Sequence, residues 1–516
     1  MGEVREDICS LRQKAKSTAG QPEAQEGEER VVFYCGSFFK IDGVTLTIRG
    51  LIRHVLKKGG KVMVVTADSP SRETVEAFVK QHQGCQVSLT TGGLVPLPGS
   101  DYYLGLYLSR KTKRVLEAFN PTSVHITNPD LVATSLIKWV LLERPKTSLT
   151  ATLHTNFQEL VLFYNTAWKP QMLWLASSFL SYTYGLCPAV YVPTEFMRKK
   201  LLAENWDTKL GVWGRGVDAD LFSPAKRSEE LRKEMGLGPR DVGVLWLGRM
   251  VAEKQPDKWL GAVKKVQKEA VDEGWGFKVV GVCVGDGEAK SLLEGVEGVI
   301  CLGWRSGEAL AMAISSCDVF VFPSEIETFG RVTLEAMSSG LPCVVNKECG
   351  DHLVKDGKNG VTLPVGETDG YTNHLRELVK DPALREKMGS SGRSMALSYS
   401  TTEVYDRMLE VYKSARTYEA LECRKRYAQK QVSFFWEVGG LVVYFLLEIL
   451  KLFTAVVALL TRGSDSEEVR LCVKSLGMHR QHLGHILAAN AVPLAILAAL
   501  ITVVIAAVAS VKDVPA

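Results

Sequence analysis

Short apolar runs rich in β-branched residues alternate with longer segments of helical period along most of this chain, and this pattern constrains its fold more than any other feature. The first runs are residues 31–34, 61–66, 124–127, 148–154 and 189–192. They lack the polar alternation of a half-exposed strand, which indicates strands buried on both faces. Buried strands separated by helices predict a parallel sheet covered on both sides, the doubly wound α/β architecture.

The same pattern starts again after a polar stretch. The second set of predicted strands is 242–247, 277–284, 298–302, 319–322 and 343–345. We therefore expect an N-terminal Rossmann-like domain at 30–222, a linker at 223–240 and a C-terminal Rossmann-like domain at 241–400. Two such domains in tandem enclose an interdomain cleft, where ligands usually bind.

The two ends of the chain depart from this pattern. Residues 1–29 are polar and acidic, which predicts a disordered leader and argues against a secretory signal or a transit peptide. Residues 401–430 are expected to form a return helix followed by a basic segment. Its Arg424, Lys425, Arg426 and Lys430 could meet anionic lipid headgroups or form an ordinary solvated face.

The last segment, 431–516, is predicted to be a membrane-associated tail. Residues 486–511 carry no charge and are long enough to cross about 30 Å of hydrocarbon, so one or more C-terminal membrane helices are expected. The earlier apolar stretch, 438–460, contains Glu448 and Lys451, which are costly at the bilayer centre and favour an interfacial or re-entrant segment.

Charge and cysteine usage indicate on which side of the membrane the domains lie. The connector between the apolar stretches carries Arg462, Arg470, Lys474 and Arg480, and the positive-inside tendency keeps such a segment cytosolic. The 11 cysteines form no C-x-x-C pair, which agrees with a reduced compartment. We expect a C-terminal anchor with the domains facing the cytosol. Lys and Arg exceed Asp and Glu by only 62 to 58, which argues against nucleic acid as a partner.

The most informative motif follows the predicted strand 319–322. A loop carries Glu327, Gly330 begins a short helix, and Glu335 lies about two turns along it, where it can face the same cleft. The free N–H groups of a helix N-terminus suit a phosphate, and carboxylates accept hydrogen bonds from sugar and ribose hydroxyls. The alternative interpretation is that Glu327 and Glu335 are ordinary solvated glutamates, which are common near the start of a helix.

Residues 322–342 closely resemble the E-x7-E signature of the family 4 retaining glycosyltransferases, and the resemblance extends from about Val31 to Gly360. It implies the GT-B fold, with an acceptor domain followed by a nucleotide-sugar domain. It further implies transfer of a hexose-type sugar from UDP or GDP with retained anomeric configuration, and no required metal ion or cofactor. Sulfoquinovosyltransferases and GDP-mannose-dependent lipid mannosyltransferases are the similar members.

The resemblance also assigns donor-binding roles to individual positions. Arg249 and Lys254 match an R-x4-K element whose cations bind the donor diphosphate, and Gly43 matches a glycine loop that lets a backbone N–H approach the same group. Glu335 would hold the ribose. Three residues, Gly303, Trp304 and Arg305, fall where relatives bind the nucleobase.

Two catalytic assignments follow from the same resemblance. Glu327 would hold the donor sugar, and His154, in a matching histidine loop, would contact the sugar near the reacting carbon. His125 also ends a predicted strand and is interpreted as structural. Asp218 and Asp220 in the interdomain segment could be mistaken for a metal-binding D-x-D pair, but the family needs no divalent ion. The stretch 347–352 departs from the family, since many relatives carry a Gly-Gly pair there.

The predicted function is therefore transfer of a hexose-type sugar from a nucleotide diphosphate sugar to a membrane lipid or lipid-linked acceptor. A site held at a bilayer meets such an acceptor without a soluble encounter, which is why the tail suggests this class. Two alternatives are a nucleotide-sugar epimerase of GT-B fold, recognised by its product without acceptor, and an inactive membrane-tethered partner subunit, recognised by failure to bind any nucleoside diphosphate.

Overall fold

The computed structural model describes most of the chain between residues 28 and 415. The described residues are 28–40, 43–89, 94–96, 103–144, 146–154, 169–204, 206 and 208–415. The predicted leader up to residue 27, the basic segment and the apolar tail lie outside them. Among the described helices, none combines the length and the apolar character that crossing a bilayer requires.

The first domain is built on a seven-stranded parallel sheet with the order β3-β2-β1-β6-β7-β8-β9. Strand β1 pairs with β2 on one side and β6 on the other, so that Val32 lies between Met63 and Val124. The strands are β1 (Arg30–Tyr34), β2 (Lys61–Thr66), β3 (Cys85–Leu89), β6 (Ser123–Ile126), β7 (Ser148–Thr152), β8 (Ala189–Val192) and β9 (Lys209–Val212). A separate antiparallel pair joins β4 (Leu94–Pro96) and β5 (Tyr103–Gly105).

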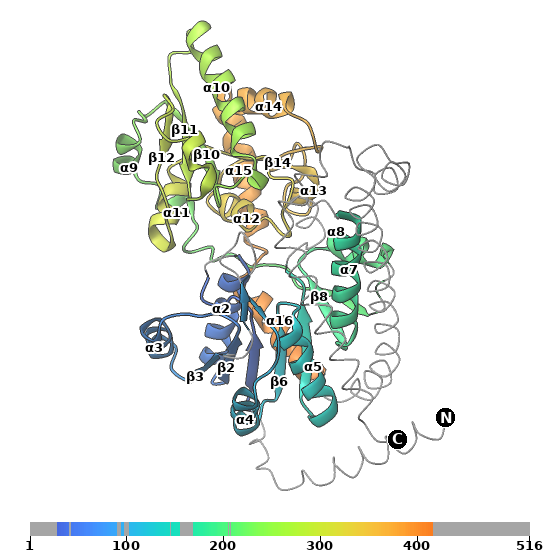
Figure 1. Cartoon of the computed structure of the whole chain (residues 1–516). Coiled ribbons are helices and arrows are strands. Elements are labelled where there is room, and N and C mark those ends of the chain that lie inside the picture. The colour runs from blue at the N-terminus through green and yellow to red at the C-terminus, as the bar shows by residue number, and fades with distance from the viewer. Residues whose placement is uncertain are drawn as a thin grey trace, which may run out of the picture. The chain divides into compact units, whose positions relative to one another are not determined.

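Helices connect these strands and cover the sheet (Figure 1). They are α2 (Gly43–Lys57), α3 (Arg72–Gln81), α4 (Arg110–Phe119), α5 (Leu131–Glu143), α7 (Lys169–Gly185) and α8 (Glu195–Ala203). Polar caps fix where several of them begin. Asp130 and Thr194, each just beyond a strand, accept the backbone N–H groups of Ala133 and Met197 and so start α5 and α8.

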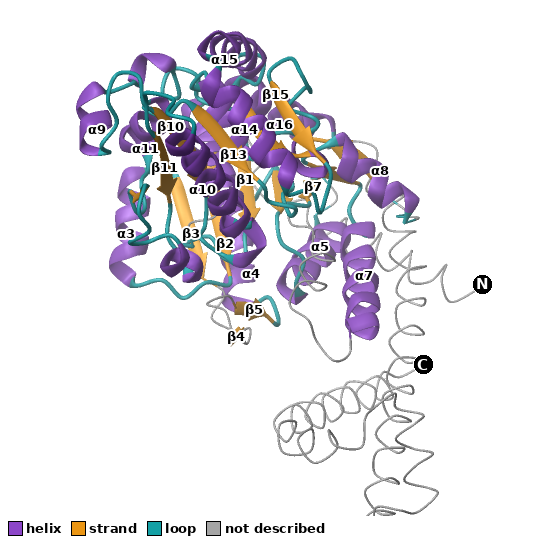
Figure 2. Ribbon diagram, turned by 90° about the horizontal axis from the view of Figure 1, so that it is seen from above, coloured by secondary structure: helices purple, strands orange, loops and turns teal. Residues whose placement is uncertain are grey.

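The second domain repeats the architecture with a six-stranded parallel sheet, in the order β12-β11-β10-β13-β14-β15. Its strands are β10 (Val242–Leu247), β11 (Val279–Val284), β12 (Val299–Cys301), β13 (Val319–Phe322), β14 (Cys343–Asn346) and β15 (Gly360–Leu363). Its helices are α10 (Pro256–Asp272), α11 (Gly307–Ser315), α12 (Arg331–Ser338), α13 (Lys347–Gly350), α14 (Asp369–Lys380) and α15 (Pro382–Ala396), with 3-10 turns η2 (Ala252–Lys254) and η3 (Glu288–Leu292). Figure 2 shows the strands enclosed by helices. The prediction of two parallel-sheet Rossmann-like domains is confirmed.

The segment 223–240 between the two domains is ordered and packed. It contains the 3-10 turn η1 (Pro224–Lys226) and the helix α9 (Glu229–Glu234). Arg232 on α9 is completely buried, donates to Asp318 Oδ2 at 2.9 Å, and also donates to three backbone carbonyls. The segment is therefore tied to the second domain by a buried ion pair.

The last described helix, α16 (Thr401–Ser414), returns to the first domain. Its apolar residues Val404, Met408, Leu409 and Tyr412 are buried in the core that also contains residues of β1, β2 and α2. In Figure 1 the orange α16 lies among the blue and teal elements of that domain. A helix that follows the second domain in sequence thus completes the core of the first.

Candidate active site

The carboxyl ends of β10 and β13 bring together the two charged motifs of the second domain. These strands are hydrogen-bonded neighbours, with Val244 opposite Val319, so the loops that follow them leave the same edge of the sheet. Lys254 Nζ lies 2.6 Å from Glu327 Oε1 and also donates to the carbonyl oxygen of Ile326 at 2.7 Å. Both side chains are only partly exposed, which strengthens the ion pair relative to one in open water.

Arg249, the other cation of its motif, has a more exposed side chain. Its Nη2 donates to Glu253 Oε1 at 3.0 Å, and 56% of the side chain is open to solvent. Glu253 is buried and holds one terminal nitrogen of this guanidinium. Arg249 therefore keeps donors free to meet an anionic group from solution.

Glu335 has a different environment from Glu327. It is buried on α12, and its Oε1 accepts from Arg331 Nε at 2.9 Å. Burial raises the pKa of Glu335, while the charge and hydrogen bond of Arg331 act in the opposite direction. The two glutamates of the motif thus have separate cationic partners, Lys254 for Glu327 and Arg331 for Glu335.

Glycines allow the loops at this edge to pack closely. Gly285 has φ +139°, and a Cβ there would lie 1.9 Å from the carbonyl oxygen of Gly248 in the loop that carries Arg249. Gly43, the first residue of α2, is exposed, and a Cβ on it would meet no atom of the described residues within 4 Å. The space over the start of α2 is therefore open.

The residues predicted to meet the nucleobase follow β12. Gly303 has φ +67°, in the left-handed region that favours glycine. Trp304 is 54% exposed and therefore does not serve as a core residue. Arg305 is also exposed, and its Nε donates to the carbonyl oxygen of Leu302 at 3.1 Å. The exposed indole ring of Trp304 could stack on a flat ligand such as a nucleobase.

His154 lies two residues beyond the end of β7 and is almost fully buried. Its Nε2 lies 2.7 Å from Thr152 Oγ1, and its Nδ1 lies 2.5 Å from Arg215 Nη2. Burial lowers the pKa of His154 well below its ordinary value, and Arg215 and His125 lower it further. This imidazole is neutral at physiological pH.

His125 shares the same buried network. Its Nε2 lies 2.7 Å from Thr152 Oγ1 and its Nδ1 lies 2.5 Å from the hydroxyl of Tyr412 on α16. Burial, and secondarily Arg215, lowers the pKa of His125 to about 3. Both ring nitrogens of His125, like those of His154, have protein partners inside the core.

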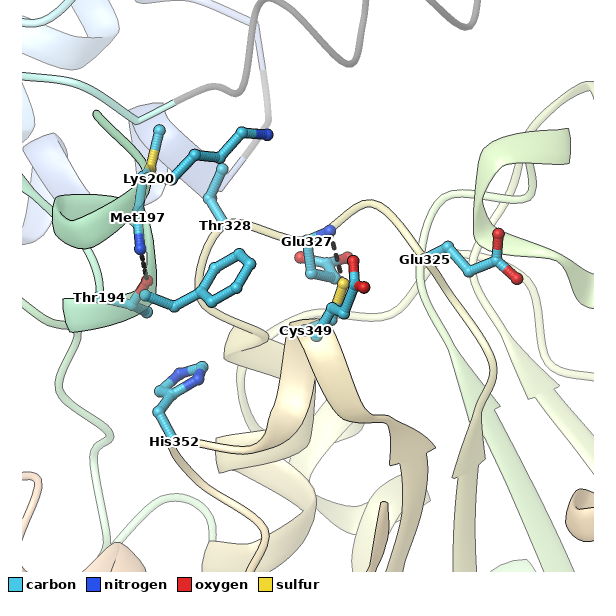
Figure 3. A pocket seen from close by; sticks show the side chains of 10 residues that line it. Thr194, Met197, Lys200, Glu325, Glu327, Thr328, Cys349 and His352 are labelled. Atoms are coloured by element: carbon cyan, nitrogen blue, oxygen red, sulfur yellow. Dashed lines mark hydrogen bonds between the residues drawn. The ribbon is translucent and has the colours of Figure 1, made fainter. Parts of the chain in front are cut away.

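A pocket lies beside Glu327 and draws on both domains (Figure 3). It encloses about 430 Å³ that is continuous with solvent, and its lining residues are Thr194, Phe196, Met197, Lys200, Glu325, Glu327, Thr328, Glu348, Cys349 and His352. In Figure 3 Glu325 points away from the other labelled side chains, and it pairs with Lys258 at 2.8 Å. Glu327 is the sequence-predicted site residue in this lining.

Sequence reasoning missed the contribution of α8 to this pocket. Phe196, Met197 and Lys200 lie on the first turns of α8, directly after the carboxyl end of β8, and that position is the signal that could have identified them. The second missed contribution is Cys349, whose Sγ accepts from the backbone N–H of Glu327 at 3.2 Å. The stretch that departs from the family pattern therefore supports the Glu327 loop directly.

The carboxylate of Asp218 is engaged in a turn. Its Oδ1 accepts from the backbone N–H groups of Asp220 and Leu221 at 3.2 and 3.0 Å. Within the part of the chain that the structure describes, no group of three or more His, Cys, Asp or Glu side chains is arranged to hold a metal ion.

The buried histidines lead to a prediction for stability. An unfolded histidine has a pKa near 6.5, whereas the folded pKa is about 3 for His125 and is also lowered for His154. Between these values the unfolded chain binds protons that the folded chain does not. Stability present above pH 6.5 is therefore lost as the pH falls, by about 1.4 kcal/mol per pH unit for each histidine.

Denaturant unfolding of the first domain, measured from pH 7 to pH 5, checks this expectation. The variant His125→Asn should show a shallower pH dependence, whereas His374→Asn, which removes a partly exposed histidine of the second domain, should keep the wild-type dependence. An unchanged slope in His125→Asn would contradict the assignment.

Comparisons with known proteins identify similar domains and relatives. A model described as Glycosyltransferase Family 4 matches residues 41–221, and one described as Glycosyl transferases group 1 matches residues 241–381. The chain is 28% identical over 402 residues to the sulfoquinovosyl transferase SQD2 of Arabidopsis thaliana, covering 75% of this chain and 72% of that protein. It is 26% identical over 395 residues to a GDP-mannose-dependent alpha-mannosyltransferase of Mycobacterium tuberculosis, covering 75% and 97%.

Among solved structures, the crystal structure of Anabaena HepE in complex with UDP and glucose is similar, with a TM-score of 0.58 and 18% identity. It matches over 75% of this chain and all of that chain. This likeness shows the two-domain fold.

Proposed function

We propose, from the premise that this chain belongs to the family 4 glycosyltransferases, that it transfers a hexose-type sugar from UDP or GDP to a membrane lipid or lipid-linked acceptor with retained configuration. The observation that carries the proposal is the contact between Lys254 and Glu327, 2.6 Å apart after two neighbouring strands. A cation for a diphosphate and an acceptor for sugar hydroxyls are adjacent there, as a nucleotide sugar requires.

The donor would occupy the edge of the second sheet. Arg249 and Lys254 would neutralise the diphosphate, and the open space over Gly43 would admit the same group from the first domain. Trp304, with Gly303 and Arg305 beside it, would meet the base, and Glu335 the ribose. Because Lys254 and Glu327 are hydrogen-bonded to each other, binding of the nucleotide sugar would draw Lys254 to the diphosphate while sugar hydroxyls replace it on the carboxylate.

The reaction would proceed on one face of the sugar. The bond between the anomeric carbon and the diphosphate oxygen breaks, and a bond from the acceptor oxygen forms on the same side. The acceptor's proton passes to the departing diphosphate oxygen. The contribution of Arg249 and Lys254 is to stabilise the negative charge that develops on that leaving group.

The acceptor class follows from the chain's last segment. The uncharged residues 486–511 would anchor the enzyme at a membrane with its domains facing the cytosol. Membrane lipids and lipid-linked sugars would then reach the site along the bilayer. The proposed donors agree with the names of relatives, one of which is GDP-mannose-dependent and one of which was crystallised with UDP.

A panel of UDP and GDP sugars incubated with the full chain and a membrane-lipid extract tests the proposal, with products identified by mass. We expect a product heavier than a lipid by one hexose-type residue, formed only when both substrates are present. A changed sugar formed without lipid would instead identify an epimerase. Transfer only to soluble acceptors would contradict the proposed acceptor class.

A further inference from the structure

We propose that Arg215 is a positioning residue that holds His154 as a neutral imidazole in a single tautomer, so that His154 serves the site as a fixed polar group and exchanges no proton with the substrate. The activity measurements that test this inference rest on the proposed function, because they require sugar transfer. The structural part of the inference concerns buried contacts among β6, β7, the residues directly after β9, and α16.

The hydrogen-bond chemistry of Arg215 fixes the tautomer of His154. A guanidinium group carries N–H donors and no acceptor. Because Arg215 Nη2 lies 2.5 Å from His154 Nδ1, that ring nitrogen must accept, and its lone pair is occupied. The ring proton is then on Nε2, which donates to Thr152 Oγ1 at 2.7 Å. An imidazolium would place a second N–H against the guanidinium, which is repulsive.

Arg215 is itself held rigidly. Its side chain is buried, its Nη1 donates to the carbonyl oxygens of Trp213 and Gly214, and its guanidinium lies over the Trp213 ring at 5.4 Å. Burial lowers the pKa of Arg215 to about 10, with Arg331 acting in the same direction and Tyr405 in the opposite one, so it stays charged at neutral pH. A positive charge in this position raises the cost of protonating the adjacent imidazole.

The hydrogen-bond directions set by Arg215 extend through Thr152 and His125 to Tyr412 on α16. Thr152 Oγ1 accepts from His154, which leaves its own hydrogen to donate to His125 Nε2 at 2.7 Å. His125 Nδ1 then carries a proton and donates to the Tyr412 hydroxyl at 2.5 Å. Four contacts therefore order the protons from the interdomain segment, through β7 and β6, to a helix that follows the second domain.

The groups that the structure describes around His154 are neutral or cationic. They are Thr152 on β7, His125 on β6, Trp213 and Arg215 directly after β9, and, acting on Arg215, Tyr405 on α16 and Arg331 on α12. Among the described residues in this set there is no carboxylate. Both ring nitrogens are already engaged, so a proton transfer to substrate would require breaking a contact with Arg215 or Thr152.

The pH dependence of kcat/KM in the full-length enzyme tests the proposal. Wild type should show no titration of His154 between pH 5.5 and 8. Arg215→Met removes the charge and the donor while burial still lowers the pKa of His154, so this pKa should rise relative to wild type, and kcat/KM should fall toward pH 5.5 in an acid limb that wild type lacks. Arg215→Lys keeps a buried cation with donors and should restore the flat profile.

Two further measurements separate positioning from a merely structural effect. In the double variant Arg215→Met with His154→Asn, nothing remains to titrate, so the new acid limb should disappear. Ring ¹⁵N shifts of labelled histidine should show Nδ1 unprotonated in wild type and altered in Arg215→Met. A loss of activity that is equal at every pH, with unchanged ring shifts, would overturn the proposal.

The ring shifts also keep the two proposals distinguishable. If wild type transfers no sugar to lipid, the proposed function fails, but the tautomer of His154 is still measured directly. If transfer occurs and His154 Nδ1 carries a proton, the positioning role of Arg215 fails by itself.

Discussion

Lys254→Met is expected to lower kcat/KM for sugar transfer by about a hundredfold or more, because it removes a charge aimed at the departing diphosphate. Methionine keeps a flexible stem of similar length, so packing around residue 254 should survive. The loss should appear mainly in kcat, since the leaving group carries more charge in the transition state than in the bound donor. Steady-state kinetics with the donor identified by the panel measures it.

The neighbouring pair offers a matched control. Lys258 bonds to Glu325 at 2.8 Å, with exposure similar to that of the Lys254–Glu327 pair. Lys258→Met removes the same kind of charge about one helical turn away, but outside the proposed donor contacts. Because Lys258 lies outside the proposed donor contacts, kcat/KM of this variant should change less than about tenfold. Equal losses in both variants would show that Lys254 acts only through general electrostatics.

Asp318→Asn is expected to destabilise the second domain by about 3–5 kcal/mol, the cost of leaving a buried charge without its partner. Asp318 accepts from Arg232 at 2.9 Å, from Arg227 at 3.0 Å and from the backbone N–H of Gly243 at 2.7 Å. Arg232 is 1% exposed and cannot reach solvent when the carboxylate is lost. Denaturant unfolding at constant pH measures the change.

Glu229→Gln is the control for this stability effect. Glu229 also lies near Arg232, at 3.9 Å, but is 65% exposed. Its removal should leave the free energy of unfolding nearly unchanged. If Asp318→Asn proves equally harmless, the segment 223–240 is not fastened by this ion pair.

Much of the architecture could be predicted because its signals are local. Continuous apolar runs identified most strands of both sheets, although β3, β9 and β15 were missed. Cys85–Leu89 and Lys209–Val212 mix polar and apolar residues, and Gly360–Leu363 is a short run that contains a glycine and a threonine. The family assignment from residues 322–342 is confirmed by matches to models of both domains. The roles given to individual site residues stay predictions, as do the retained configuration and the lipid acceptor.

Other features depend on contacts between distant segments. The polar composition of 223–240 gave no indication that Arg232 would be buried. A charged residue is buried only where a partner of opposite charge is also present, and here that partner is Asp318, which is distant in the sequence. His154 could be placed at a strand end, but its protonation state depends on Arg215, which is 61 residues away.

The sequence by itself determined the two parallel sheets and the strand ends at which charged residues gather, since periodicity records which residues are buried and parallel strands end at a common edge. Only the tertiary structure decided which polar groups meet there. Lys254 pairs with Glu327 while Arg331 takes Glu335, and α16 enters the first domain to reach His125 through Tyr412. The physical reason is that a hydrogen bond or ion pair depends on a few ångströms between side chains from different elements, and residue spacing along one chain does not encode that distance.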